Sequence, residues 1–210
     1  MRIVIFGAAG ATGRALVTQA LTQGHQVTAF VRTPAKFELK HAGLNVVQGD
    51  VADAAAVERA LFGQDAVLCT LGAATPLKRD QTLVNGMDNI VRAMERSGPR
   101  RLVYLSFLGV SGGREQLSLL GRHVVAPLIL RNVVTDHEAK ENIITRSGLD
   151  WTIVRPPRLT NGPHTGAYRH GGNIKAASVI PMISRADVAD FMLLQLDDRA
   201  YLRKAPAVMY

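Results

Sequence analysis

Apolar and polar positions along the chain follow two periods that alternate as far as about residue 196. Short runs rich in Val, Ile and Leu predict buried strands, at residues 3–6, 26–31, 44–47, 66–70, 101–105 and 151–154. Stretches with apolar residues at helical spacing predict helices between them, at residues 13–23, 53–61, 81–96, 135–147 and 184–196, with a short helix beginning at Thr33-Pro34. Strands that alternate with helices indicate right-handed βαβ units and a parallel sheet. We therefore predict an α/β fold, a Rossmann-like doubly wound parallel sheet in a single domain over residues 1–210.

Polar residues mark where several of these helices begin. Asp53 and Ser184 each precede a helical stretch and are expected to be N-caps. Thr135, with Glu138 three residues later, has the sequence of a capping box and predicts the start of the helix over 135–147. That start places His137 in the first helical turn, where we expect a surface position and a capping role, the alternative being a proton donor.

Two segments show neither period clearly. Residues 111–134 are apolar and mostly helical in pattern but contain Pro127, which predicts either a packed helix with a kink or a lid or dimer face. Residues 155–175 are interrupted by proline and glycine, and long irregular segments of this kind are usually functional or disordered. We expect the second segment to be a substrate loop over the carboxyl ends of the strands, or else a mobile solvated loop. Its basic residues are Arg155, Arg158, Arg169 and Lys175.

A glycine motif, Gly-x-x-Gly-x-x-Gly, lies between the first predicted strand and the first predicted helix. Gly7 permits a tight turn, Gly10 lets a pyrophosphate approach the backbone, and Gly13 allows the helix to pack closely on the strand. Backbone N–H groups at the start of the helix then bind the phosphates. The motif predicts a dinucleotide site, the alternative being a glycine turn that serves packing alone. Its predicted contacts are Gly7, Ala9, Gly10, Ala11, Thr12 and Gly13.

The end of the second predicted strand distinguishes between the two nicotinamide cofactors. NAD-binding proteins usually carry Asp or Glu there to bind the ribose 2′-hydroxyl. This chain instead has Arg32 and, four residues later, Lys36. The planar guanidinium of Arg32 suits a 2′-phosphate, and Lys36 adds a second positive charge. We therefore predict NADP(H), unless both cations are merely solvated surface residues.

Two further strand ends carry candidate cofactor contacts. Asp50, after the third strand, either accepts a hydrogen bond from the adenine amino group or caps the following turn. Cys69, within the fourth strand, is expected to be a small buried hydrophobic residue rather than a nucleophile. Small residues after the fourth strand leave room for a ribose or nicotinamide. The contacts predicted at these two ends are Asp50, Val51, Leu71, Gly72 and Ala73.

Composition narrows the class of protein. The chain has 210 residues, of which 47% are hydrophobic and 20% charged, as in ordinary globular proteins. A net charge of +8 with only 5% aromatic residues favours a small anionic ligand over nucleic acid. One cysteine excludes an intramolecular disulfide and a cysteine-rich zinc site, and we predict no metal. No apolar run approaches a membrane span, and residues 3–6 are too few for a signal-peptide core, so we expect a soluble cytoplasmic protein without a membrane partner.

The motifs together resemble a known family. The glycine motif, Val31-Arg32 and the strand ends at Asp50 and Gly72 are similar to those of atypical short-chain dehydrogenases with an NAD(P)H-binding fold. The second half of the chain resembles the biliverdin-IXβ reductase (flavin reductase) family within that group, and the resemblance runs nearly end to end. The segments that carry this narrower resemblance are Ser147-Gly148-Leu149, Pro156-Pro157, Thr165-Gly166-Ala167-Tyr168 and Val179-Ile180 through Asp187 to Phe191-Met192-Leu193.

The resemblance implies a function and a set of site residues. That family reduces flavins and biliverdin isomers with NADPH, which implies a flavin bound as substrate rather than as a prosthetic group. Its active-site serine falls on Ser106, with either a catalytic role or a hydrogen bond to the nicotinamide amide. Its active-site histidine falls on Arg158, whose guanidinium stays charged and suits an anion better than proton transfer. The remaining predictions are a cofactor contact at Pro156 and a site for a small planar anionic acceptor at Phe107, Pro157, Arg158 and Arg169.

The chemistry of reduction depends on the source of a proton. Short-chain dehydrogenases use a Tyr-x-x-x-Lys pair, but four residues before Lys140 this chain has Asp136. Flavins and quinones take hydride readily and can take their proton from water. With the resemblance, this predicts an NADPH-dependent reductase of flavins, quinones or a biliverdin-like planar acceptor. The alternatives are a non-catalytic NADP(H)-sensing regulator that binds a partner protein, and an epimerase acting on a nucleotide sugar. We expect a monomer or a weak homodimer.

Overall fold

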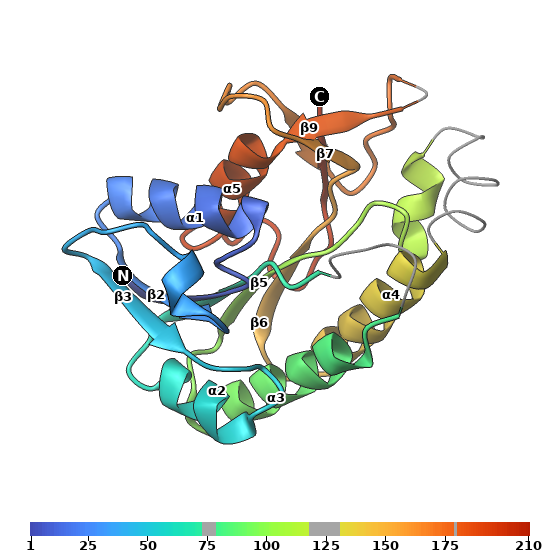
Figure 1. Cartoon of the computed structure of the whole chain (residues 1–210). Coiled ribbons are helices and arrows are strands. Elements are labelled where there is room, and N and C mark those ends of the chain that lie inside the picture. Colours follow the sequence, from blue (N-terminus) through green and yellow to red (C-terminus); the bar gives the residue numbers. More distant parts are fainter. Residues whose placement is uncertain (73–78, 118–130, 179) are drawn as a thin grey trace.

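A six-stranded parallel sheet forms the centre of the molecule (Figure 1). The structure, a computed structural model, describes residues 1–72, 79–117, 131–178 and 180–210. The strand order of the sheet is β3-β2-β1-β4-β5-β6. The strands β1 and β4 are parallel, and between them the chain switches from adding strands on one side of β1 to adding them on the other. This order confirms the predicted Rossmann-like, doubly wound, single-domain fold. The strands are β1 (Arg2–Phe6), β2 (Gln26–Val31), β3 (Leu44–Gln48), β4 (Ala66–Cys69), β5 (Arg101–Leu105) and β6 (Asp150–Val154).

Helices cover both faces of the sheet. On one face α1 (Ala11–Thr22) packs against α5 (Arg185–Leu194). The other face is covered by α2 (Ala54–Leu61), α3 (Gln81–Ser97) and α4 (Arg131–Thr145). Successive side chains of a strand point to opposite faces, so Ile3 and Ile5 join the core under α1 while Val4 and Phe6 join the core under α2 and α3. The two cores fix the sheet between its helical layers.

Shorter elements extend the chain beyond the sheet. The segment predicted as an irregular loop over residues 155–175 instead contains two strands, a correction that pattern alone could not supply because their partners lie far away in sequence. They are β7 (Arg158–Thr160), which pairs with β9 (Met182–Ser184), and β8 (Arg169–Gly171), which pairs with β10 (Ala207–Met209). Two short 3₁₀ helices are η1 (Pro34–Lys36) and η2 (Ser111–Gln116). Most of the predicted kinked helix over 111–134 lies outside the described residues.

The structure confirms two of the predicted helix starts and contradicts a third. Asp53 accepts hydrogen bonds from the N–H groups of residues 55 and 56, and Ser184 accepts one from Asp187, so both are N-caps. The predicted start of α4 at Thr135 is wrong: the chain is already helical at Arg131, and the Thr135 hydroxyl donates to the Arg131 carbonyl at 2.9 Å. Burial of Val134 draws the preceding turn into the helix and outweighs the local capping sequence.

Asp187 joins three separate parts of the chain at the start of α5. Its carboxylate is fully buried and accepts hydrogen bonds from the backbone N–H of Thr165 at 2.7 Å, that of Gly166 at 2.9 Å and the hydroxyl of Tyr210 at 2.6 Å. Burial alone would raise the pKa of Asp187, but these donors outweigh it and lower the pKa to about 2. The ionised carboxylate therefore holds the segment after β7, and the C-terminal residue, against α5.

We predict that Asp187→Asn lowers the free energy of unfolding by about 1.5–3 kcal/mol at neutral pH, because hydrogen bonds to a charged acceptor are lost. The folded-state pKa lies below the ordinary value of 3.8, so this stabilisation is complete above that value and is lost as pH falls toward about 2. Denaturant unfolding of both proteins at neutral pH and near pH 2 measures the difference. The exposed Asp197→Asn is the control and should unfold like the wild type; an unchanged gap at acid pH would contradict the role of the charge.

Candidate functional site

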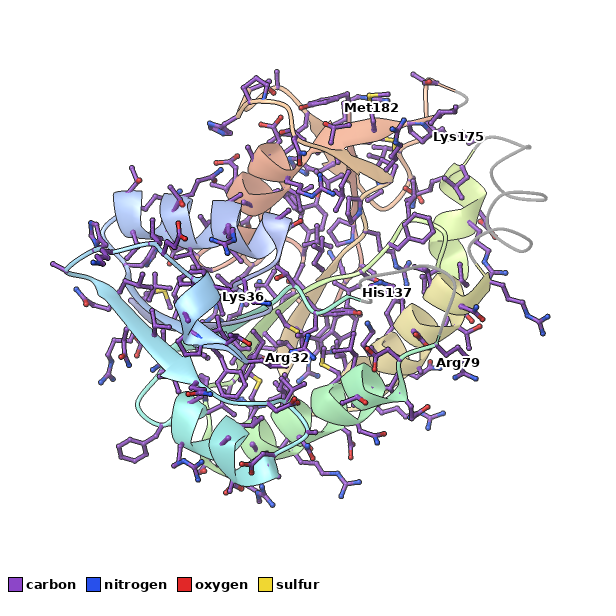
Figure 2. All side chains as sticks on the ribbon, viewed as in Figure 1. Arg32, Lys36, Arg79, His137, Lys175 and Met182 are labelled. Carbon is purple, nitrogen blue, oxygen red and sulfur yellow. The ribbon has the colours of Figure 1, made fainter. Side chains whose placement is uncertain are left out.

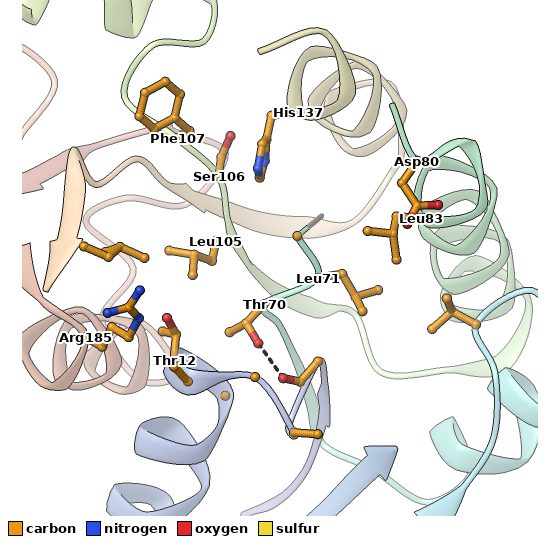
Figure 3. Close-up of a pocket in the computed structure, with 18 of the residues that line it drawn as sticks. Thr12, Thr70, Leu71, Asp80, Leu83, Leu105, Ser106, Phe107, His137 and Arg185 are labelled. Carbon is orange, nitrogen blue, oxygen red and sulfur yellow. Dashed lines mark hydrogen bonds between the residues drawn. The ribbon is translucent and has the colours of Figure 1, made fainter. Parts of the chain in front are cut away.

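A cavity of about 810 Å³ runs along the carboxyl ends of the central strands, at the point where the strand order reverses (Figure 3). Ligands of doubly wound folds bind at this position. Most of the residues predicted from the sequence line it. They are Gly7, Ala9, Gly10, Ala11, Thr12, Gly13, Arg32, Asp50, Val51, Leu71, Gly72, Ser106, Phe107, Pro156, Pro157 and Arg158. Lys36 and Arg169 are not among the lining residues, and Ala73 lies outside the described part of the chain.

The three glycines of the motif have different physical roles. Gly7 has φ +84°, a left-handed conformation, and its carbonyl accepts a hydrogen bond from the Thr70 hydroxyl at 3.2 Å (Figure 3). A Cβ on Gly13 would lie 2.1 Å from the Gly7 carbonyl oxygen, so this position requires glycine for packing. A Cβ on Gly10 would meet only that oxygen, at 3.3 Å. Gly10 therefore leaves its open side to the cavity rather than to the protein.

The N-terminus of α1 faces the same cavity. Gly10 is the N-cap and offers no side-chain oxygen to the first turn of the helix. The first N–H groups of a helix lack intrahelical partners and attract anions. Together with the open face of Gly10, this arrangement fits the pyrophosphate of a dinucleotide.

Arg14 connects the glycine loop to the cationic segment after β2. Its guanidinium donates to the carbonyl of Ala9 at 3.1 Å and to that of Lys36 at 2.6 Å, and it lies 5.2 Å from the ring centroid of Phe37. Sequence reasoning did not identify Arg14, although its position directly after Gly13 is a usable signal. Lys36 itself is exposed, and in Figure 2 it is labelled in the same region of the molecule as Arg32.

Asp50 has a local partner as well as a place in the cavity wall. Its Oδ1 accepts a hydrogen bond from the N–H of Ala52 at 2.9 Å, so it caps the turn that precedes α2. This is one of the two roles considered for Asp50, and it does not exclude the other, because the residue also lines the cavity. Val51 lies beside Gly86 of α3, where a Cβ would come within 2.5 Å of the Val51 side chain.

Ser106 is held by a buried ion pair. Its hydroxyl donates to Oε1 of Glu141 at 2.5 Å, and the Glu141 carboxylate pairs with the Arg155 guanidinium at 2.5 Å. Glu141 is 3% exposed, so Arg155 supplies the charge that its burial requires. With its proton directed to Glu141, the Ser106 oxygen presents lone pairs to the cavity.

His137 is buried, which corrects its predicted surface position. It is 8% exposed, lines the cavity, and has Nδ1 2.7 Å from the hydroxyl of Tyr104. Because α4 already includes Arg131, His137 lies inside the helix, one turn after Val133, which also lines the cavity. Burial, with the nearby charge of Lys140, holds the pKa of His137 well below its usual value.

Lys140 and Cys69 are buried and do not line the cavity. The Lys140 ammonium donates to the carbonyl of Leu71 at 3.1 Å and lies 5.8 Å from the ring centroid of Tyr104. Burial raises the pKa of the Cys69 thiol to about 11, as expected of a hydrophobic residue rather than a nucleophile. Lys140 thus supports the backbone after β4 from behind the cavity.

The far end of the cavity combines apolar and cationic side chains. Phe107 and Pro157 provide apolar surface, and the exposed Arg158 provides positive charge. Arg185, which the sequence pattern did not reveal, lines the cavity beside Thr12 (Figure 3) and donates to Oδ1 of Asn161 at 2.6 Å. Arg169 lies elsewhere and donates to the backbone carbonyl of residue 210. Lys175 also lies apart from the cavity residues Arg32 and His137 (Figure 2).

Other kinds of site are not found in the described part of the chain. No cluster of three or more His, Cys, Asp or Glu side chains there is arranged to hold a metal ion. No described helix is long and apolar enough to cross a membrane.

Comparison with known proteins identifies relatives along nearly the whole chain. A family model described as NAD(P)H-binding matches residues 7–199. YhfK of Bacillus subtilis, an uncharacterized sugar epimerase, is 30% identical over 95% of this chain and 89% of its own length. A chloroplastic protein of Arabidopsis thaliana is 31% identical over 79% of this chain. The matched region covers only 61% of the length of that relative. The structure of ChuY from Escherichia coli, an anaerobillin reductase, superposes with a TM-score of 0.83 at 23% identity, over 99% of this chain and 96% of ChuY.

We predict that Gly10→Val removes nicotinamide dinucleotide binding while the fold survives, because the new side chain projects into the space where the pyrophosphate would lie. Titration calorimetry measures the affinity and circular dichroism the fold. Gly13→Ala is the contrasting variant: its Cβ meets backbone atoms, so it should lose stability by about 1–3 kcal/mol or more. Full cofactor affinity in Gly10→Val would show that the open face of Gly10 serves another purpose.

Proposed function

The chain belongs to the NAD(P)H-binding family, and on that premise we propose that it is an NADPH-dependent oxidoreductase that reduces a planar acceptor such as a flavin, a quinone or a biliverdin-like compound. The observation that carries this proposal is that one cavity is lined both by the glycine loop and by Ser106, Phe107 and Arg158. When bound, the reduced nicotinamide supplies the hydride. The residues of the chain bind and orient the two reactants next to each other, which is the main contribution a protein makes to such a transfer.

The choice of NADPH rests on the residues after β2. Arg32 lines the cavity, and the segment from the end of β2 to Lys36 contains no Asp or Glu to bind a 2′-hydroxyl. Arg14 holds the backbone of Lys36 to the glycine loop, which fixes the segment that carries both cations. A guanidinium in this position favours a phosphate over a hydroxyl.

The acceptor site rests on the residues after β5 and β6. Phe107 and Pro157 offer apolar surface to a planar ring system, and Arg158 offers a permanent positive charge to an anionic group. Ser106 fits the role of hydrogen-bond acceptor, for example from the nicotinamide amide, because its proton is directed to Glu141. The name of ChuY, anaerobillin reductase, is consistent with a tetrapyrrole among the acceptors.

A panel of acceptors tests the proposal. The protein is incubated with NADPH and FMN, riboflavin, a quinone or biliverdin, and the oxidation of NADPH is followed. Reduction of at least one acceptor is expected. If NADP(H) binds but no acceptor is reduced, the chain is a cofactor-sensing regulator instead. Conversion of a nucleotide sugar without net consumption of NADPH would favour an epimerase, the activity after which YhfK is named.

We predict that the wild type prefers NADPH to NADH, and that Arg32→Ala reduces this preference by about ten- to a hundredfold, since one hydrogen bond to a charged group contributes roughly 1.5–3 kcal/mol. Dissociation constants for both cofactors, measured by calorimetry, give the ratio. Affinity for NADH should change little in the variant. Equal wild-type dissociation constants for the two cofactors would contradict the assignment to NADPH.

We predict that Arg158→Ala raises KM for FMN much more than KM for riboflavin, which lacks the phosphate. The turnover number should change little, because an interaction that holds ground state and transition state equally does not alter the chemical step. Arg169→Ala is the matched control, since its guanidinium lies outside the cavity lining, and it should leave both KM values unchanged. A large fall in turnover with both flavins at constant KM would mean that Arg158 acts on the transition state.

A further inference from the structure

Two parallel contacts join α4 to the end of β5. Tyr104 and Ser106 lie two residues apart and so share one face of the strand end, while His137 and Glu141 lie one turn apart on α4. Tyr104 pairs with His137 and Ser106 pairs with Glu141. The two contacts are successive, and Figure 3 shows Ser106 and His137 as neighbours in the cavity wall. The proposed function makes use of Ser106 but leaves His137 without a role.

The position of the proton on His137 follows from its partner. Tyr104 is fully buried, and burial holds the pKa of its hydroxyl well above its usual value, so the hydroxyl keeps its proton. Within the described part of the chain, Nδ1 of His137 is the one hydrogen-bond partner of this hydroxyl. The hydroxyl therefore donates to Nδ1. A neutral imidazole with an acceptor at Nδ1 carries its single proton on Nε2.

This pairing leaves an N–H donor on a residue of the cavity wall. Nε2 of His137 has no hydrogen-bond partner among the residues that the structure describes, and His137, which is 8% exposed as a whole residue, lines the cavity. The adjacent Ser106 presents lone pairs there, because its own proton is directed to Glu141. The wall therefore offers one acceptor and one donor side by side.

We propose that His137, held by Tyr104 as the Nε2–H form, donates a hydrogen bond to a carbonyl oxygen of the planar acceptor and so makes conjugated carbonyl compounds preferred substrates. This inference rests on the proposed reductase function. When the carbonyl carbon receives the hydride that the reduced nicotinamide gives up, the π electron pair moves onto the oxygen, which then takes a proton from water. His137 stabilises the negative charge on that oxygen and keeps its own proton, as a neutral imidazole donor can. His137 acts here as a catalytic residue and Tyr104 as a positioning residue.

The tautomer is tested on the protein without cofactor. Imidazole nitrogen chemical shifts from NMR should show His137 as the Nε2–H form at neutral pH. Tyr104→Phe keeps the ring but removes the hydroxyl, and should give a mixture of both tautomers. The chain contains a matched pair outside the cavity, in which the Tyr201 hydroxyl lies 2.7 Å from Nδ1 of His170. Tyr201→Phe should leave the spectrum of His137 unchanged, and an Nδ1–H form of His137 in the wild type would overturn the proposal.

The donor role is tested with phenanthrenequinone as the carbonyl acceptor. His137→Phe should weaken its binding to the NADP⁺-loaded protein about tenfold, the effect of one lost hydrogen bond. It should also lower kcat with this acceptor by at least about tenfold, because the donor acts on charge that develops in the transition state. His137→Gln, which can also present an N–H, should recover most of both losses, and His170→Phe should cause neither. Circular dichroism checks that each variant is folded.

The outcomes separate this inference from the proposed function. If the wild type binds the quinone but oxidises no NADPH, the reductase proposal fails while the binding comparison still decides the role of His137. If His137→Phe weakens the binding of NADP⁺ rather than that of the quinone, His137 holds the cofactor and the inference is wrong. Equal losses in His137→Phe and His137→Gln, with native circular dichroism, would also overturn it.

Discussion

The close approach of α1 to β1 is the constraint on which the site depends. The carbonyl oxygen of Gly7 lies where a Cβ on Gly13 would come within 2.1 Å of it, so the helix can reach this position only with glycine there. The same turn gives Gly7 its positive φ and lets Gly10 face open space. The N-terminus of α1 is thereby directed at the point where the strand order reverses. Every other part of the cavity wall is arranged around that fixed point.

The fold was predictable where the determinants are local. Strands and helices follow from periods of apolar residues, and the N-caps Asp53 and Ser184 act within their own turns. The start of α4 was not predictable, because burial of Val134 competes with the capping sequence at Thr135. The strands between residues 155 and 175 were missed for a related reason. Each pairs with a partner near the C-terminus, and no pattern within the segment encodes that pairing.

The residues of the site likewise divide into those that the sequence predicts and those that depend on packing. Glycines and cations next to strand ends can be read from the sequence, because parallel strands bring their carboxyl ends to one edge. His137 and Arg185 were missed, since their places in the wall depend on where α4 and α5 pack. Arg155 shows the opposite error. It was counted with the basic substrate segment, but its charge is paired with the buried Glu141 and is not available to an acceptor.

Pairing of Arg155 with Glu141 has a consequence for how the two halves of the site differ. In one part of the cavity wall, Ser106 and His137 are each held by a hydrogen bond to a buried partner, Glu141 and Tyr104 respectively. The free charge is carried instead by Arg158, which is exposed and follows two buried prolines. The orientation of Ser106 and His137 thus depends on the contacts between α4 and the end of β5, whereas the charge of Arg158 lies outside these contacts. Substitutions at Arg158 can therefore change the charge of the cavity wall without disturbing the hydrogen bonds at Ser106 and His137, whereas a substitution at Arg155 removes the partner of Glu141.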